Sequence, residues 1–343
     1  MFKNTKNIFL LIGLTLINIS FFCARIEIVK DNNFAIKIMG LILVAPILIF
    51  EIRNYHKLRD ILLASLLVIV TLFLTIHTNN FTLLYLAVFG ILYNNRQHEK
   101  IIINDLITKL IVLAINLIYM LIAGYKITYG TNFGFVHSNH FGYIIFSIYV
   151  SINILKRNNN FFVDTCLFLL AEAILYLSGC RTAQLIIIIY TLLKYIPLTK
   201  MTKKIATILP IGIIIGSAIM TFVYIDRNPV AVNINSMLSG RLWYQQQYYD
   251  RYGINLIGNN IETYIGEPLD NMYFRFLINF GIIGATVIIL RLYRLIDKTN
   301  DKKMLAFYIA YIIYGASEWM AAMPTASPIM VTSSSKNKGE KKK

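Results

Sequence analysis

Apolar residues occur along this chain in long blocks separated by short polar segments. A helix needs roughly 20 apolar residues to cross the hydrocarbon core of a bilayer, and only a helix satisfies every backbone polar group within such a segment. The chain has about eleven blocks near that length, at 7–23, 34–51, 61–77, 80–94, 107–124, 141–155, 161–178, 183–197, 205–225, 273–291 and 304–320. The pattern predicts an all-α, polytopic helical membrane bundle of eleven or twelve transmembrane helices.

The end of the chain breaks this pattern. Residues 321–331 are apolar, but they are too short to span a bilayer and contain two prolines. A run rich in serine and lysine follows them. We expect a single transmembrane domain over residues 1–320, followed over residues 321–343 by a short apolar segment and a disordered basic tail. The apolar segment either forms a half-inserted hairpin or belongs to a twelfth helix.

Lysine and arginine predict the orientation in the membrane. The net charge is +16, and the basic residues gather in short clusters between apolar blocks. This distribution is typical of the positive-inside bias and does not favour nucleic acid as a partner. The clusters fall mainly in every second loop, which predicts a multi-pass membrane protein with a cytoplasmic N-terminus. The loops 226–270 and 125–140 would then be extracytoplasmic.

The length of the loop 226–270 suggests where a site lies. Connections in compact domains are usually about 4–6 residues, and much longer ones tend to be functional. The polar residues of the predicted outer side gather in a few short stretches, namely Phe135–Gly142, Ser178–Thr182, Ser239–Gly258 and Leu269–Tyr273. We therefore expect an active site at the extracytoplasmic face.

These stretches resemble motifs of the O-antigen polymerase and ligase family, which includes capsular and exopolysaccharide repeat-unit polymerases. The matching elements are F-x-H-x-N-x-F-G from Phe135, S-G-x-R-T from Ser178, S-G-R from Ser239 closing on Y-G-I-N-L-I-G, and D-N-x-Y from Asp270 leading into F-G-I-I-G. Together they cover roughly residues 130–320. Many members of the family have His-Asn where this chain has Asp270-Asn271.

The resemblance implies a polysaccharide polymerase of the bacterial cell (inner or plasma) membrane, a metal-independent glycosyltransferase without a cofactor. Such an enzyme transfers a glycan from a polyprenyl diphosphate carrier onto the next lipid-linked repeat unit. Its partners would be the polyprenyl-diphosphate-linked oligosaccharide, membrane lipids and other polysaccharide export and chain-length proteins. Two alternatives stay open: an O-antigen-type ligase, and a flippase or transporter of lipid-linked oligosaccharides.

The chemistry of this transfer selects candidate residues. Charge builds on the departing diphosphate, and arginine matches phosphate oxygens with two parallel donors. We expect Arg181, Arg241 and Arg251 to bind the diphosphate. The acceptor hydroxyl needs a base, which would be Asp270 or His137. Each has an ordinary alternative: Arg181 could face lipid headgroups, and Asp270 and His137 lie at helix starts where polar residues often cap.

Aromatic and amide side chains suit sugar rings, which they bind by stacking and by hydrogen bonds to hydroxyls. Arg241 opens an expected helix on which Tyr244, Gln245 and Tyr248 share its face. The full set of expected glycan-binding residues is Asn139, His140, Trp243, Tyr244, Gln245, Tyr248, Asn271 and Tyr273. Glu318 could be a further acid or a partner for an arginine. Asp105, Lys109, Asp164 and Glu172 are expected to form structural pairs or to lie at helix ends.

Overall fold

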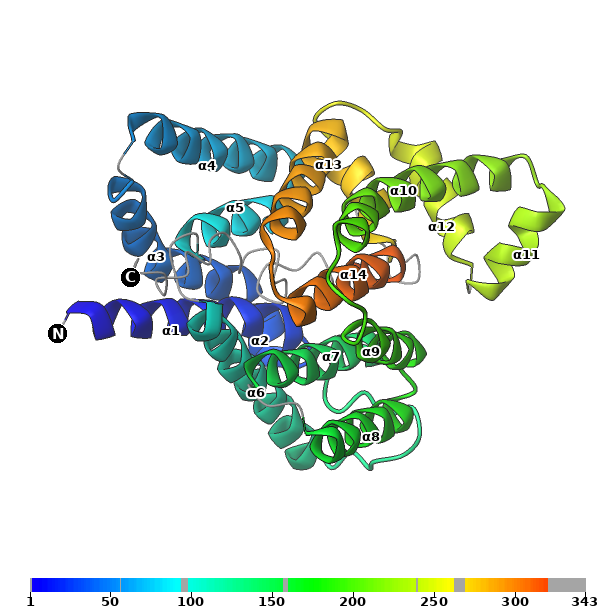
Figure 1. The fold of residues 1–343 in the computed structure, drawn as a ribbon, viewed down its shortest axis with the longest axis horizontal. Coiled ribbons are helices and arrows are strands. Elements are labelled where there is room, and N and C mark those ends of the chain that lie inside the picture. The colour runs from blue at the N-terminus through cyan, green and yellow to red at the C-terminus, as the bar shows by residue number, and fades with distance from the viewer. Residues whose placement is uncertain are drawn as a thin grey trace. The chain divides into compact units, whose positions relative to one another are not determined.

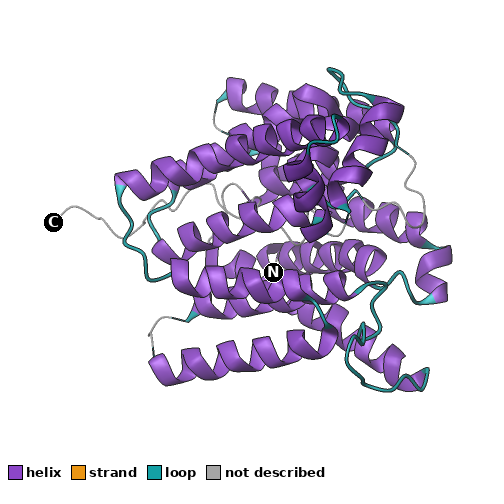
Figure 2. Ribbon diagram, turned by 90° about the vertical axis from the view of Figure 1, so that its right-hand side faces the viewer, coloured by secondary structure: helices purple, strands orange, loops and turns teal. Residues whose placement is uncertain are grey.

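A computed structural model describes residues 2–55, 57–93, 98–156, 160–238, 240–261 and 269–319. Over these residues the regular structure is helical, as Figure 2 shows. The helices are α1 (Phe2–Phe22), α2 (Glu27–Asp31), α3 (Asn33–Arg53), α4 (Leu58–Thr78), α5 (Thr82–Tyr93), α6 (His98–Ile122), α7 (Ser138–Leu155), α8 (Phe161–Ser178), α9 (Arg181–Leu193), α10 (Lys200–Ile225), α11 (Pro229–Met237), α12 (Arg241–Tyr252), α13 (Met272–Lys298) and α14 (Lys302–Ser317).

The predicted all-α class is confirmed, and each apolar block of the sequence coincides with a helix. Six helices, α3, α4, α6, α8, α10 and α13, are long and apolar enough to cross a membrane, and α1, α5 and α9 are shorter apolar helices. The described chain is thus an all-helical membrane protein. The expected segment 321–343, together with Ser239 and residues 262–268 of the long loop, lies outside the described residues.

The outer surface of α10 carries an apolar stripe at helical spacing. Ile208, Ile211, Ile215 and Ile219 are 42–54% exposed although they recur every three or four residues on one face. Soluble proteins seldom leave so continuous an apolar face in water. Such an apolar face is suited to contact with the lipid tails of a bilayer.

The chain divides into two compact units. Within the described residues, the first comprises 2–65 and 88–180, and the second comprises 66–87 and 181–319. The expected single transmembrane domain over residues 1–320 stays a prediction, and each unit is described separately below.

In the first unit, α1 packs closely against α3 through two glycines. A Cβ added to Gly13 would lie 2.6 Å from Val44 Cγ2, and one added to Gly40 would lie 2.7 Å from Ile17 Cγ1. Small residues allow such close approach between helices in membranes. α6 packs against α1 and α7, and α7 packs against α8.

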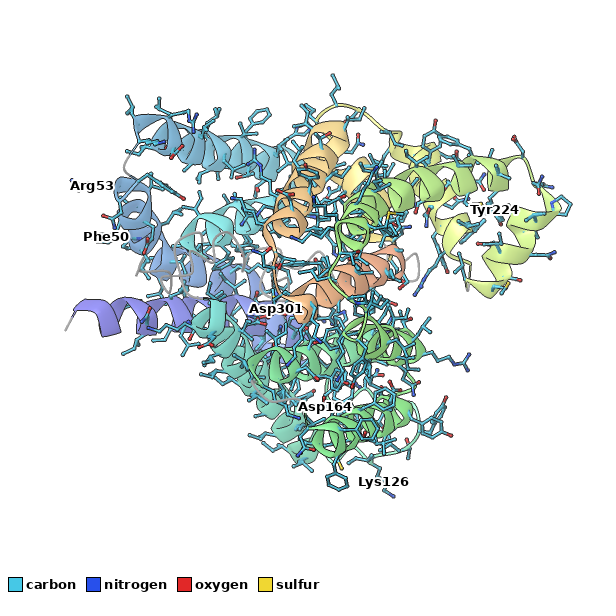
Figure 3. All side chains as sticks on the ribbon, in the orientation of Figure 1. Phe50, Arg53, Lys126, Asp164, Tyr224 and Asp301 are labelled. Atoms are coloured by element: carbon cyan, nitrogen blue, oxygen red, sulfur yellow. The ribbon has the colours of Figure 1, made fainter. Side chains whose placement is uncertain are left out.

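Two pairs in the first unit confirm the expected structural role of polar residues near or within the helices. Lys109 Nζ donates to Asp105 one turn earlier on α6. Lys156 Nζ donates to Oδ1 of Asp164 at 2.7 Å, and Asp164 is labelled on α8 in Figure 3. Each pair joins residues that burial would otherwise leave as isolated charges.

The second unit is built around α10, α13 and α14. α10 packs against α12, α13 and α14, while α9 packs against α14. In Figure 1, α11 and α12 follow the far end of α10 and α12 returns alongside it. Tyr224 near the end of α10, labelled in Figure 3, accepts through its hydroxyl from Asn235 Nδ2 of α11 at 3.4 Å. The elements of the predicted long loop are thus ordered against this unit.

Helix α13 is interrupted at Gly281, where φ is 66° and ψ is −170°. The residues after α12 fill this interruption with backbone hydrogen bonds. Ile282 N donates to Asn255 O at 3.0 Å, Ile283 N donates to Leu256 O at 3.1 Å, and Asn259 N donates to Ile278 O at 3.1 Å. These hydrogen bonds satisfy backbone groups that a continuous helix would have paired internally. The same hydrogen bonds connect the Y-G-I-N-L-I-G stretch of the sequence with the F-G-I-I-G stretch.

Candidate functional site

The start of α12 fixes the position of Arg241. Gly240 precedes it with a positive φ of 83°. Asn235 Oδ1 then accepts hydrogen bonds from Leu242 N at 2.9 Å and Trp243 N at 3.1 Å. These amides would otherwise lack partners at a helix N-terminus. The sequence prediction that a helix begins at Arg241 is confirmed.

Arg241 joins two carboxylates that are distant in the sequence. Its Nη2 donates to Glu318 Oε1 at 2.9 Å and lies 3.6 Å from Asp270 Oδ2. Glu318 is only 2% exposed, whereas Arg241 is 19% and Asp270 28% exposed. A buried carboxylate requires a partner of this kind. The expectation that Glu318 could pair with one of the arginines is confirmed.

The helix-capping role expected as the alternative for Asp270 belongs to its neighbour Asn271. Asn271 Oδ1 accepts from Tyr273 N and Phe274 N, both at 3.0 Å, and its Nδ2 donates to Ser217 Oγ at 2.8 Å. Asn271 is therefore the N-cap of α13 and a tie to α10. The Asp270 carboxylate extends instead toward Arg241.

Arg275 and Trp319 belong to the same region and were missed by the sequence reasoning. The guanidinium carbon of Arg275 lies 4.1 Å from the centroid of the Trp319 ring, which is cation–π geometry. Arg275 also interacts electrostatically with Asp270. The positive charge of Arg275 could have indicated it, because an arginine at the predicted outer end of a helix runs against the positive-inside bias.

The inward face of α12 is engaged in packing. Gln245 is 3% exposed, and its Oε1 accepts from Thr221 Oγ1 of α10 at 2.8 Å. Tyr248 is fully buried in an apolar cluster with Leu269, Phe274 and Ile278. Tyr273, 1% exposed, donates from its hydroxyl to Ile312 O at 3.0 Å. These three expected glycan-binding residues are therefore buried in packing contacts and are not accessible to a glycan in this structure.

The other side of α12 presents aromatic surface. Trp243 is 41% exposed, and its ring meets that of Tyr244 edge to face with centroids 4.9 Å apart. Of the expected glycan-binding residues on α12, Trp243 is exposed and Tyr244 is half-buried, so both stay accessible. Arg251, in the last turn of α12, is also exposed.

Arg181 is the first residue of α9 and is exposed. It belongs to the second unit, as Arg241 does. A cation in this position faces the positive end of the helix dipole, which disfavours it unless an anion is also bound. The helix that begins at Arg181 packs against α14, the helix after which Glu318 follows.

The three expected residues of the F-x-H-x-N-x-F-G stretch lie in the first unit. His137 is the N-cap of α7, with Nδ1 accepting from Asn139 N at 3.1 Å. Cys180 Sγ donates to Asn139 Oδ1 at 3.6 Å. His140 meets the ring of Phe22 edge to face, and burial lowers its pKa to about 4 with a further contribution from His137. The capping alternative foreseen for His137 is thus the geometry found.

Two carboxylates and two guanidinium groups therefore converge in the second unit, from the start of α12, both sides of the start of α13 and the end of α14. The side chains of Arg241 and Asp270 are partly exposed, whereas that of Glu318 is buried. Such a cluster can bind an anion and exchange a proton. Among the described residues, no group of three His, Cys, Asp or Glu side chains is arranged to hold a metal ion. Comparisons of the chain with protein-family models, curated proteins and solved structures find no match.

Proposed function

We propose that this protein is a polysaccharide polymerase, a membrane glycosyltransferase that uses a polyprenyl-diphosphate-linked glycan as donor. The observation that carries the proposal is the contact of Arg241 with Asp270 and Glu318. In this proposal Arg241 is the cation for the leaving diphosphate, and Asp270 beside it is the carboxylate that takes the acceptor proton. Arg241 and Asp270 belong to two separate sequence motifs, and their side chains lie 3.6 Å apart.

Asp270 is the residue we assign as the base. The glycan C1 forms a bond to the acceptor oxygen while its bond to the diphosphate oxygen breaks. The electron pair leaves with the polyprenyl diphosphate, and the acceptor hydroxyl gives its proton to the Asp270 carboxylate. Glu318 is less suited to this role because it is 2% exposed and holds Arg241. His137 is less suited because its Nδ1 is occupied as a helix cap.

Arg241 and Arg181 would hold the diphosphate as negative charge develops on it. Arg241 is oriented by Glu318, so its guanidinium is positioned before substrate arrives. The bound diphosphate would supply the anion that Arg181 needs at the start of α9, where the helix dipole disfavours a cation alone. Trp243 and Tyr244 offer aromatic faces for sugar rings on the accessible side of α12. No metal ion is needed in this scheme.

The proposal includes a topology finer than six apolar helices. Eleven or twelve spans with a cytoplasmic N-terminus would place the loop 226–270, and with it Arg241 and Asp270, outside the cytoplasm of a bacterial cell membrane. Polyprenyl-linked repeat units would meet the site there. A ligase that passes finished glycan to another acceptor would use the same donor chemistry, whereas a flippase would need no base beside the cation.

The proposal is tested with the full-length protein in detergent, a synthetic polyprenyl-diphosphate-linked oligosaccharide and a chelator. We expect a ladder of longer lipid-linked glycans and release of polyprenyl diphosphate. Arg241→Gln and Arg181→Gln should each lower the rate by about 10²-fold or more, as removal of an oxyanion donor does. Arg294→Gln, at the other end of α13, is the matched control and should retain the rate.

The alternatives give different results. Transfer of glycan only to a different acceptor would indicate a ligase. In cells, accumulation of single repeat units in the cytoplasm of a deletion strain would indicate a flippase, while exported single units would support a polymerase. Normal polymer from both arginine variants would show that the diphosphate assignment is wrong.

A further inference from the structure

Two consecutive residues after α14 each hold one arginine. Glu318 accepts a hydrogen bond from Arg241 Nη2 at 2.9 Å. The ring of Trp319 lies beneath the guanidinium of Arg275, 4.1 Å from ring centroid to guanidinium carbon. Trp319 is itself 7% exposed and packs against Phe276 with centroids 5.4 Å apart. The end of α14 therefore positions two guanidinium groups that come from different helices.

The two arginines are satisfied to different degrees. Arg241 has a carboxylate at hydrogen-bond distance. Arg275 is held over the face of a ring, which attracts the charge without accepting from the in-plane N–H donors. Its Nε is enclosed, and in the described part of the chain it has no hydrogen-bond partner. Buried donors are rarely left in this state without a function.

The formal charges of these four side chains balance while Asp270 and Glu318 are ionised. Arg241 and Arg275 contribute two positive charges, and Asp270 and Glu318 contribute two negative ones. Asp270 interacts with both arginines. A proton on Asp270 would leave one net positive charge beside two guanidinium groups. That is the charge a departing diphosphate requires.

We propose that Arg275 is a second diphosphate-binding residue, held ready on the Trp319 ring beside Asp270. The inference rests on the proposed function, in which a polyprenyl diphosphate is the leaving group. When the acceptor proton passes to Asp270, that carboxylate stops attracting both arginines. Arg275 and Arg241 then donate to the diphosphate oxygens that have received the electron pair of the broken C1–O bond. Proton transfer and leaving-group stabilisation are coupled through one side chain.

A second cation gives the site a preference for two phosphates over one. Arg241 alone can grip a single phosphate with two parallel donors. Arg275 adds a second set of parallel donors. A monophosphate has too few oxygens to accept two parallel hydrogen bonds from each arginine at once. The ratio of affinities for the diphosphate and the monophosphate of the same polyprenol therefore reports on Arg275. A variant that only lowers the folded fraction weakens both ligands equally and leaves the ratio unchanged.

The experiment measures binding of polyprenyl diphosphate and polyprenyl monophosphate of equal chain length to the full-length protein in detergent. Arg275→Gln should reduce the affinity ratio by about tenfold to a hundredfold, as expected for lost hydrogen bonds to a charged group. Arg275→Lys should cause a smaller drop of the same sign, because it keeps the charge and loses the fork. Trp319→Leu should lower the diphosphate affinity by releasing Arg275, and Arg294→Gln should change neither ligand.

The outcomes separate this inference from the proposed function. If Arg241→Gln lowers diphosphate binding while both Arg275 variants keep the normal ratio, Arg275 has a structural role and the inference is overturned. If the unaltered protein does not bind polyprenyl diphosphate, the proposed function fails as well. Where Arg275→Gln does not yield folded protein, the ratio measured with Arg275→Lys decides.

Discussion

Gly258 and Gly281 meet backbone to backbone where α13 is interrupted. A Cβ on Gly281 would lie 2.4 Å from Leu256 O and 2.5 Å from Gly258 N, and one on Gly258 would lie 2.1 Å from Asn279 O. Both residues have positive φ, 66° at Gly281 and 84° at Gly258. Neither position has room for a side chain, because the nearest atoms belong to the backbone. This contact holds the segment after α12 against α13, and with it the start of α13 beside Arg241.

Alanine at either glycine should destabilise the protein. A Cβ there is strained by the positive φ and displaces neighbouring backbone, which together should lower the free energy of unfolding by ~2 kcal/mol or more. Thermal unfolding in detergent, followed by the fluorescence of Trp243 and Trp319, measures the loss. Gly212→Ala and Gly216→Ala on α10, where a Cβ meets no atom within 4 Å, are matched controls and should be neutral or stabilising. Equal stability of all four variants would contradict this account of the contact.

The helices of this chain could be predicted from sequence because their cause is local. Each block of apolar residues predicted a helix that the described chain contains, and the amphipathic spacing after Gly240 predicted α12. The interruption of α13 could not be predicted, because Gly281 adopts its conformation only when a segment some twenty residues earlier supplies the backbone partners. The hydrophobic periodicity of α13 gives no information about a partner segment elsewhere in the chain.

The candidate site likewise contains residues that could be predicted from the local sequence and residues that could not. Arg241, Asp270 and Glu318 could be proposed one by one from their chemistry and their outward position. Gln245, Tyr248 and Tyr273 were expected to bind glycan, yet their residue types do not reveal that α10, α13 and α14 cover them. Trp319 carried no signal of its own, since a single tryptophan near a helix end is common at membrane interfaces. Its role follows from its contact with the guanidinium of Arg275, which lies 44 residues earlier in the sequence.

The adjacent residues Asp270 and Asn271 should separate catalysis from stability. Asn271→Ala removes the cap of α13 and the bond to Ser217, so unfolding free energy should fall by ~1 kcal/mol or somewhat more. Asp270→Asn keeps the shape and leaves the cap intact, so the unfolding temperature should change little. On the proposed mechanism the same change removes the base and should slow glycan transfer by about 10²- to 10⁴-fold. Asp250→Asn, an exposed change on α12, serves as the control for both measurements.

A reversed pattern would contradict the assignment. If Asp270→Asn unfolded the protein and Asn271→Ala left its stability intact, the cap would have been assigned to the wrong residue. If Asp270→Asn kept both stability and transfer rate, another group would be the base.

His140 should make the stability of the protein depend on pH. Its pKa in the folded protein is about 4, against an ordinary value of 6.5, because burial and then His137 disfavour the charged ring. The unfolded chain therefore takes up a proton on His140 before the folded protein does. The contribution to stability is complete above pH 6.5 and is lost as the pH falls toward 4, by up to ~3 kcal/mol. Thermal unfolding measured across this window should show the decline.

A variant that cannot titrate provides the control for His140. His140→Phe keeps a ring against Phe22 and removes the proton site, so its unfolding temperature should vary less between pH 6.5 and 4 than that of the unaltered protein. His137 is exposed and differs from His140 in this respect. An identical pH dependence in the His140→Phe variant would refute the assignment to His140.

The orientation of the long loop can be measured with single cysteines. Cys23 and Cys180 are buried, so only Cys166 among the native thiols needs replacement by serine. In that background, Asp250→Cys reports on α12 and Lys298→Cys on the end of α13, both at exposed positions. A membrane-impermeant maleimide should label the α12 position in intact cells and the α13 position only after the membrane is opened. This outcome follows from the distribution of lysine and arginine, which predicts that the two ends of α13 lie on opposite sides. Labelling of the α12 position only in opened cells would put Arg241 and Asp270 in the cytosol, where the polymerase proposal could not hold, because the lipid-linked units would join before their export.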